Sequence, residues 1–387
     1  MGIKKILGTS LLAVAAVGAL AACGKKKTTT KSDDSSKVTT AAPKKDFGTL
    51  NVSELAGNIR VSFNILAQEL GYFEEEGVKV NTKAIGGINA LTAISEGQLD
   101  ILNTGFIPDL SALIGGADLV FFGGTAVEGG AIIANKSVAS KYKDAEGKID
   151  FTDLEDAKIG LQRNEASWVV ARQYVLEHYP SVDLDVVETE SDSHTHYFAE
   201  FTDVQQAVSS GSIDLGFLPY EYAFKAVESG LNVEILAKAG ELIPNYVCCR
   251  EVTSKTTYEA KYDAIVAYER ARIRAWQYYE NEANRSNVVE ILAKHSGNDK
   301  DYVEQYLFGG ATKLSADPNK NGILSYFTAV KNAGVFNSLD QTAVDALVLA
   351  DHVDTKAYKA ALDSLIAEDS SNTFYQQTLT LYNQYNA

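Results

Sequence analysis

The feature that most constrains this fold is a twofold alternation of short apolar runs and helical stretches between Thr49 and about Ala239. In the first series, apolar runs alternate with residues recurring at helical spacing. The same order returns in a second series. A strand–helix–strand repeat predicts a parallel sheet with helices on its faces, so we expect an α/β chain of two similar lobes. The expected strands are 50–55, 78–84, 99–104, 157–162, 184–189, 213–218 and 233–239.

One nine-residue pattern links the two series. Residues 93–101 (AISEGQLDI) and 207–215 (AVSSGSIDL) each read as a helix end, a Gly and a strand that opens with apolar–Asp–apolar. Glycine at the end of a helix readily takes the left-handed conformation. Common α/β sequence grammar can also produce such an echo, but with the duplicated order it favours two related lobes.

The chain after Val252 has a different pattern. Long stretches at helical spacing are separated by Gly- and Asn-rich breaks, without strand-like alternation, and they predict a helical set that packs on a lobe. We expect the chain to return to the first lobe through 246–249. This gives a first lobe of 47–135 plus 245–387 and an inserted second lobe of 136–244. Two crossing segments then form a hinge with a cleft.

The N-terminus carries an export signal. Met1–Ala22 has Lys4 and Lys5 followed by an apolar run, which is typical of a secretory signal peptide. Leu20–Cys23 resembles the lipobox of bacterial lipoproteins, which implies that Cys23 is lipidated and holds the protein at a membrane. A plain transmembrane anchor is the alternative. Residues 23–46 are polar and small, without a large apolar side chain after the cysteine except Val38, and predict a disordered tether.

Charge and cysteine usage exclude several classes. The formal net charge of −16 argues against nucleic-acid binding, which needs a basic face. Apart from Cys23, the cysteines are the adjacent Cys248 and Cys249, a poor disulfide candidate. Two small buried side chains in a strand are the expected outcome there. His194 and His196 are too few imidazoles for a zinc site, so no metal is expected, and 192–196 is interpreted as a loop or cleft rim.

Several motifs in order resemble those of a known family. Residues 67–80 (AQELGYFEEEGVKV), then Gly86-Gly87 and 96–101 (EGQLDI), resemble solute-binding proteins of the sulfonate, taurine and nitrate uptake group, which includes binders of thiamine-precursor pyrimidines. The resemblance covers about 47–240. It implies a two-lobed, type II periplasmic-binding-protein-like fold, a lipid-anchored monomer outside the cytoplasm, and delivery of a small anionic or zwitterionic ligand to an ABC permease with its ATPase.

The ligand of an open α/β sheet sits beyond the carboxyl ends of the strands, where helices begin. This places candidate contacts at the helix starts and at two strand ends. They are Asn58, Gly86, Gly87, Asn89, Asn103, Thr104, Glu128, Arg163, Ser167 and Trp168. Structural alternatives stay open: a plain turn at Gly86-Gly87, an N-cap at Asn58, solvation or pairing with Glu165 for Arg163, core packing for Trp168 and an exposed loop for Glu128. The family's small-residue loop is absent at 163–168.

The sequence does not favour an enzyme. It has no Gly-x-Ser-x-Gly elbow, no phosphate-binding Gly-x-x-x-x-Gly-Lys loop and no His-Glu-x-x-His motif. No cofactor is expected. The alternative function is a lipid-anchored adhesin or sensor ectodomain, which would bind a protein through a large exposed apolar patch.

Overall fold

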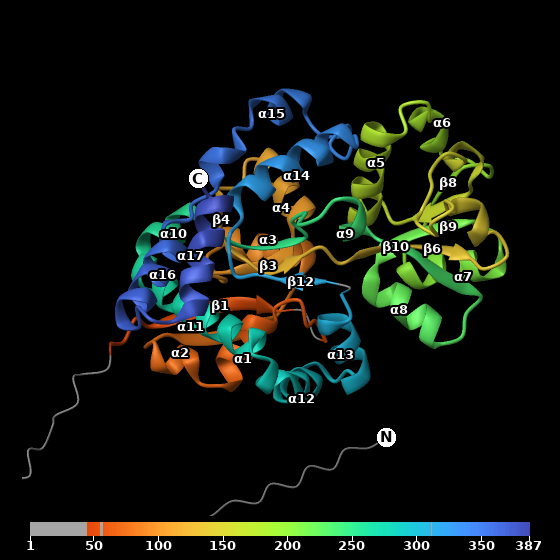
Figure 1. The fold of residues 1–387 in the computed structure, drawn as a ribbon. Helices are drawn as coiled ribbons and strands as arrows, with labels where there is room; N and C mark the ends of the chain where they lie inside the picture. Colours follow the sequence, from red (N-terminus) through yellow and green to blue (C-terminus); the bar gives the residue numbers. More distant parts are fainter. Residues whose placement is uncertain (1–44, 55–56, 311) are drawn as a thin grey trace, which may run out of the picture. The chain divides into compact units, whose positions relative to one another are not determined.

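The protein is represented by a computed structural model that describes residues 45–54, 57–310 and 312–387 (Figure 1). The expected signal peptide, the lipidated Cys23 and nearly all of the tether lie outside the described residues. Within the described ranges, no helix is both long and apolar enough to cross a membrane.

The first sheet is built from β1 to β4 and from β11, a strand that follows those of the second sheet in the chain. β1 and β2 pair in parallel, and β11 pairs antiparallel with β3 and β4. A parallel bridge between Val52 and Ile101 joins the two parts. The resulting order is β2–β1–β3–β11–β4. The strands are β1 (Thr49–Glu54), β2 (Lys79–Ala84), β3 (Leu102–Gly105), β4 (Leu119–Gly124) and β11 (Cys249–Ser254).

The second sheet repeats this order. Its strands run β8–β7–β9–β6–β10, with β7 parallel to both β8 and β9. β6 lies antiparallel between β9 and β10, as β11 does in the first sheet. β6, which the expected division gave to the first lobe, is therefore hydrogen-bonded into the second sheet. The strands are β6 (Gly130–Asn135), β7 (Ile159–Leu161), β8 (Thr195–Tyr197), β9 (Leu215–Pro219) and β10 (Val233–Lys238).

The nine-residue echo in the sequence corresponds to a repeated set of contacts. Gly97 and Gly211 both have left-handed φ values, +71° and +78°. The Asp that follows accepts a hydrogen bond from a backbone N–H in or next to the first strand of its series, β1 or β7. Asp100 accepts from the N–H of Asn51 at 2.8 Å, and Asp214 accepts from the N–H of Lys158 at 2.9 Å. The duplication therefore extends to individual backbone atoms.

Two segments connect the sheets. The outgoing one contains β5 (Ala126–Val127), and the returning one contains α9 (Ala239–Leu242) and the stretch to Cys249. The two segments lie side by side, since Val127 bridges Val247 and the N–H of Glu128 donates to the carbonyl of Tyr246 at 3.0 Å. β5 also pairs with β12 (Lys313–Leu314).

Helices cover both sheets (Figure 1). In the first series they are α1 (Ser62–Glu69), α2 (Tyr72–Glu75), α3 (Gly87–Ser95) and α4 (Phe106–Ile114). The second sheet carries η1 (Ala139–Tyr142), η2 (Leu154–Asp156), α5 (Ala166–His178), α6 (Leu184–Val187), α7 (Phe201–Ser210) and α8 (Tyr220–Glu228). The C-terminal set is α10 (Lys255–Ala260), α11 (Tyr262–Glu280), η3 (Glu282–Asn284), α12 (Arg285–Ser296), α13 (Lys300–Phe308), α14 (Lys320–Asn332), α15 (Gln341–Ala346), η4 (Leu349–His352), α16 (Lys356–Glu368) and α17 (Thr373–Tyr385).

The strand expected at 184–189 is wrong. Residues 184–187 form α6, because the Asp183 carboxylate accepts hydrogen bonds from the N–H groups of Asp185 and Val186 and so caps a helix. The edge strand is instead β8, where a loop or cleft rim was expected.

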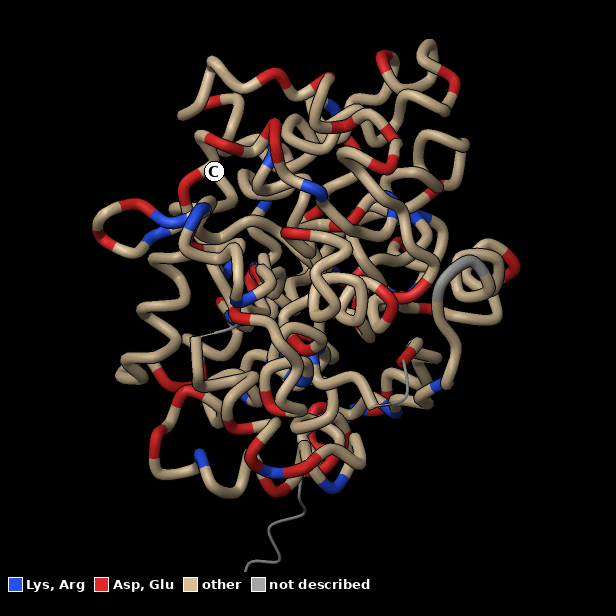
Figure 2. Tube along the Cα trace, turned by 90° about the vertical axis from the view of Figure 1, so that its right-hand side faces the viewer, with Lys and Arg blue, Asp and Glu red and all other residues tan. Residues whose placement is uncertain are grey.

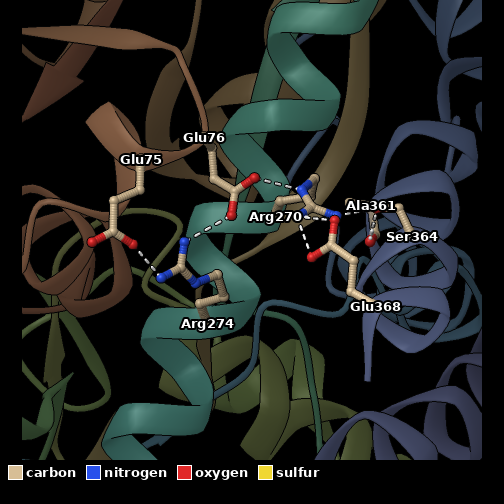
Figure 3. A network of polar contacts seen from close by, with 7 residues as sticks. All are labelled: Glu75, Glu76, Arg270, Arg274, Ala361, Ser364 and Glu368. Atoms are coloured by element: carbon tan, nitrogen blue, oxygen red, sulfur yellow. Dashed lines mark hydrogen bonds and ion pairs between the residues drawn. The ribbon is translucent and has the colours of Figure 1, made fainter. Parts of the chain in front are cut away.

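An ion-pair network ties the C-terminal helices to α2 (Figure 3). Glu76 accepts from Arg270 at 2.5 Å and from Arg274 at 2.8 Å. Arg270 also pairs with Glu368 on α16 at 2.8 Å. The long apolar and aromatic helix α11 is thereby fastened on both sides. Elsewhere, acidic residues are spread along the described chain with Lys and Arg interspersed (Figure 2).

Candidate functional site

A small cavity lies where the two connecting segments meet the carboxyl ends of strands from both sheets. Its volume is about 140 Å³. The first sheet contributes residues after β1 and β3, and the second sheet contributes residues after β7 and β9. We call this space the crossover cavity. Its lining consists of Arg60, 105–108, Gly129, Gly130, 164–166, Pro219, Tyr246, Cys248, Cys249 and Tyr326.

Three helices of at least nine residues begin at the crossover cavity: α4, α5 and α8. The connecting segments hold two of these helix starts in equivalent ways. Phe106 at the start of α4 donates its N–H to the carbonyl of Cys248 at 3.1 Å. Tyr220 at the start of α8 donates to the carbonyl of Gly129 at 2.8 Å. Helix N-termini carry partial positive charge, so these three helix starts favour anionic oxygens in the cavity.

Arg60 and Glu221 connect the two sheets beside the cavity. Arg60 follows β1 and forms an ion pair with Glu221 in the first turn of α8. The Arg60 and Glu221 side chains are 21% and 20% exposed, so solvent screens the pair only in part. Burial acts to lower the pKa of Arg60, but the Glu221 carboxylate and the neighbouring Tyr306 and cysteines raise it well above its ordinary value. The guanidinium is therefore a permanent cation at the cavity wall.

A second carboxyl group, Glu165, lines the cavity from the start of α5. It caps the helix by accepting hydrogen bonds from the N–H of Ser167 at 3.2 Å and from its hydroxyl at 3.1 Å. Burial raises the pKa of Glu165 to about 7, although both bonds from Ser167 act to lower it. Its charge therefore changes near neutral pH.

The hinge is closely packed at Gly130. A Cβ on this residue would lie 2.7 Å from the Cβ of Ser167, so a larger residue would push β6 and α5 apart. The Gly130 N–H donates to the Tyr246 hydroxyl at 2.8 Å. Burial raises the pKa of Tyr246 well above its usual value, so this hydroxyl stays protonated. Both connecting segments are thus joined directly behind the cavity.

None of the ten site residues predicted from the sequence is in the lining of this cavity. Gly86, Gly87 and Asn89 follow β2, the edge strand of the first sheet, and so lie at the start of α3, away from the lining. Asn58 accepts the N–H of Arg60 at 2.7 Å and so orients the residue that does line it. The three glycine and asparagine positions after β2 remain predictions for a larger or differently placed ligand.

Asn103, Thr104 and Glu128 are buried next to the cavity and engaged by other groups. Asn103 donates its N–H to Ser53, and the Thr104 hydroxyl donates to Asp109. Burial raises the pKa of Asp109 to about 8 despite that bond. Glu128, with φ +67°, accepts from the N–H of Asn245 at 2.8 Å and pairs with Lys313 at 3.0 Å. Its described contacts hold the two connecting segments together.

Arg163 and Trp168 line a separate pocket of about 530 Å³ between α5 and the end of α14. Arg163 is largely exposed, pairs with Glu190 at 2.8 Å and lies over the Tyr197 ring. Trp168 is buried and packs edge-on against Phe217. Ser167 is fully buried at the start of α5. Asn164 lines both the crossover cavity and this pocket, so the two are neighbours.

Sequence reasoning missed the lining residues Arg60 and Glu165 and the thiol pair, and it also missed Glu221, the ion-pair partner of Arg60. The sequence could have identified Arg60 and Glu165, because each follows the first strand of a series by a few residues. Glu221 had no local signal, since its partner Arg60 is far away in the sequence. In the described part of the chain no group of three or more His, Cys, Asp or Glu side chains has the arrangement of a metal site.

The comparisons with known proteins agree with this geometry. The family described as NMT1/THI5 like matches residues 58–286, more than half of the chain. The chain belongs to this family. A search of curated proteins gave no match.

Three solved structures share the fold. The ligand-binding component of an ABC-type import system from Staphylococcus aureus, solved with zinc, is 14% identical, covers 81% of this chain and 99% of its own, and has a TM-score of 0.59. The alkanesulfonate-binding protein SsuA from Xanthomonas axonopodis pv. citri, bound to MOPS, is 18% identical, with coverages of 81% and 99% and a TM-score of 0.56. The nitrate-binding protein NrtA from Synechocystis PCC 6803 is 14% identical, with coverages of 84% and 91% and a TM-score of 0.60. The NMT1/THI5-like chain therefore has the two-lobed periplasmic-binding-protein fold that its sequence predicted.

Proposed function

We propose that this NMT1/THI5-like chain is a solute-binding protein of an ABC importer, lipid-anchored outside the cytoplasm through Cys23, and not an enzyme. It captures a small anionic or zwitterionic molecule in the crossover cavity and presents it to a permease. One observation carries the proposal. Three helix N-termini and the Arg60 guanidinium converge on one cavity, which both sheets line.

The cavity suits a compact ligand with an acidic group. Arg60 and the helix N-termini supply positive charge and N–H donors, which favour sulfonate, nitrate or carboxylate oxygens. Glu165 in the lining and Glu221 beside Arg60 supply negative charge. An ammonium group on the ligand would be stabilised there, so an amino acid of the sulfonate or carboxylate type matches both signs. A volume of about 140 Å³ restricts the ligand to a few heavy atoms unless the lobes open.

Ligand capture would work through closure of the two lobes about the connecting segments. A ligand that touches residues of both sheets stabilises the closed state in proportion to its preference for it. In this proposal the lobes are 47–135 plus 245–387 and 136–244, except that β6 pairs in the second sheet. The protein acts as a monomer that docks on the permease when closed. Tyr246 and Gly130 join the two connecting segments at the pivot.

The test is a thermal-shift and calorimetric screen of the unit Lys44–Ala387, which forms one compact body. The panel contains nitrate, taurine, ethanesulfonate and a hydroxymethylpyrimidine. A binder raises the melting temperature by mass action. We expect Arg60→Ala to weaken a binder by tenfold or more, because a charge-assisted contact is lost at a partly buried site.

Arg163→Ala is the matched control, because Arg163 is the exposed cation of the neighbouring pocket. Affinity unchanged in Arg163→Ala and lost in Arg60→Ala supports the crossover cavity. The reverse result moves the ligand to the pocket at Trp168. Binding of a protein partner without any small-molecule binder would replace the transport proposal with an adhesin or sensor function.

A further inference from the structure

We propose that Cys248 and Cys249 form a thiol modification site inside the crossover cavity, at which a small disulfide captures Cys249 and fills the space available to a ligand. The blocking effect rests on the proposed function, whereas the modification itself does not. Neither the family match nor the similar structures assign a role to this cysteine pair.

The geometry carries this proposal. Both cysteines are free and both line the cavity. Cys249 is the first residue of β11, and Cys248 precedes it in the returning segment. Their sulfur atoms are 3.6 Å apart, within hydrogen-bond distance for thiols. Cys248 is half-buried and Cys249 is 9% exposed, so a reagent reaches them through the cavity mouth.

The surrounding groups favour a thiolate on one sulfur. The hydrogen bond shared with Cys248, together with the cations Arg60 and Arg250, lowers the pKa of Cys249 to about 7 against the effect of burial. The same shared bond raises the pKa of Cys248 well above its usual value, as does burial. The charged and titratable groups that face the pair from other elements are Arg60, Glu221, Glu165, Tyr246, Tyr306 and Tyr326. Cys249 is therefore the nucleophile and Cys248 the protonated partner.

The chemistry is a thiol–disulfide exchange. The Cys249 thiolate attacks one sulfur of a disulfide R–S–S–R, a bond forms between Cys249 and that sulfur, and R–S⁻ leaves with the electron pair and takes a proton from water. No further oxidant is needed. Closure of a Cys248–Cys249 disulfide is not part of the proposal, because adjacent residues strain the required geometry.

The adduct would also disturb the helix start that the returning segment holds. The Cys248 carbonyl accepts the first N–H of α4, and Arg60 lines the same cavity close to Cys249. A methylthio group on Cys249 would occupy space in a cavity of about 140 Å³, beside the cation that the proposed ligand needs. Size selection follows, since a narrow cavity admits methylthio donors and excludes bulky aromatic disulfides.

The experiment uses methyl methanethiosulfonate as the small reagent and an aromatic disulfide, 5,5′-dithiobis(2-nitrobenzoate), as the bulky one. The protein is the unit Lys44–Ala387, and peptide mass spectrometry locates the adduct. We expect Cys249 to react at least tenfold faster than Cys248 at pH 7, with a rate that rises through pH 7. The bulky reagent should react at least tenfold more slowly than the small one, relative to their rates with free cysteine.

Variants test the local electrostatics. Cys248→Ala removes the shared hydrogen bond and should raise the midpoint of the rate profile by about one pH unit, whereas Cys248→Ser retains a donor and should restore it in part. Arg60→Gln should slow the reaction at pH 7, and Arg163→Gln should leave it unchanged. Equal reactivity of the two cysteines, or a midpoint near that of free cysteine, would overturn the modification site.

The effect on ligand is scored separately. The methylthio adduct should abolish the thermal shift given by any panel compound that stabilises the unmodified protein. If Cys249 is modified and the shift persists, the blocking role is overturned while the thiol site stands. Modification without any stabilising compound in the panel counts against the proposed function and leaves the reactivity result in force.

Discussion

At the scale of single residues, burial decides which charges near the crossover cavity are permanent. Arg60 keeps its proton at all relevant pH values because Glu221 faces it. Glu165 accepts hydrogen bonds from Ser167, and burial outweighs these bonds and the attraction of Arg60, so the pKa of Glu165 is raised to about 7. Arg60 thus gives the cavity a fixed charge, whereas the charge of Glu165 changes with pH.

Glu165→Gln tests this at the level of stability. The folded-state pKa of about 7 lies above the ordinary value of 4.5, so the buried neutral form is favoured by folding. The corresponding stability is complete below pH 4.5 and is lost as pH rises through 7. We expect the free energy of unfolding of the wild type to fall by up to about 3 kcal/mol relative to the variant between pH 4.5 and 8. Urea unfolding at a series of pH values measures this difference, and parallel curves would contradict it.

At the scale of elements, the two series use the same device to turn a helix into a strand. The Gly after α3 and the Gly after α7 both adopt left-handed backbone, and the Asp three residues later anchors the next strand. This junction explains why the sequence echo is so local. A left-handed turn needs Gly, and a strand anchor needs a carboxylate at a set spacing.

Gly97→Ala and Gly211→Ala should each destabilise the protein by about 1 kcal/mol, because a Cβ disfavours positive φ. A Cβ at Gly97 meets no atom within 4 Å, and one at Gly211 approaches Asn135 only to 3.6 Å, so strain in the backbone is the main cost. Chemical denaturation measures both. Gly115→Ala is the comparison, since Gly115 has a φ of −73° at the end of α4. A loss there as large as at Gly97 would contradict the conformational explanation.

At the scale of the whole molecule, the two connecting segments and the Arg60–Glu221 pair link the two sheets. The segments are a covalent link, whereas the ion pair is a reversible contact beside the cavity. Opening the lobes would break the pair but leave the segments intact. The balance between open and closed states therefore depends on this pair, on the hydrogen bonds between α5 and α14 such as that from Arg172 to the Asn332 carbonyl, and on the ligand.

Glu221→Gln should shift the free protein toward the open state by about fivefold, which corresponds to about 1 kcal/mol for a half-buried ion pair. Small-angle X-ray scattering should show a larger radius of gyration without ligand. Glu228→Gln, at the exposed end of the same helix, is the control. If both variants scatter like the wild type, the pair does not hold the lobes closed.

Much of the fold could be predicted from the sequence, because its determinants are local. The periodicity of apolar residues identified β1, β2, β3, β7, β9 and β10 but not β4, β6 or β8, and the Gly and Asp spacing identified the duplicated junction. Residues 184–189 were mistaken for a strand, because Val186, Val187 and their neighbours fit a strand while the Asp183 cap decides for a helix. The membership of the family also followed from short motifs in 67–101.

The sequence by itself determined two α/β series and a helical C-terminal set, and it predicted a site at helix starts. Only the tertiary structure decided which helix starts share a cavity. Those after β3, β7 and β9 meet there together with Arg60 after β1, while the one after the edge strand β2 does not. The tertiary structure also decided that Arg60 pairs with Glu221 and that Cys248 and Cys249 line the cavity. The physical reason is that strand order and ion pairs join residues far apart in the chain, whereas periodicity and capping act within a few residues.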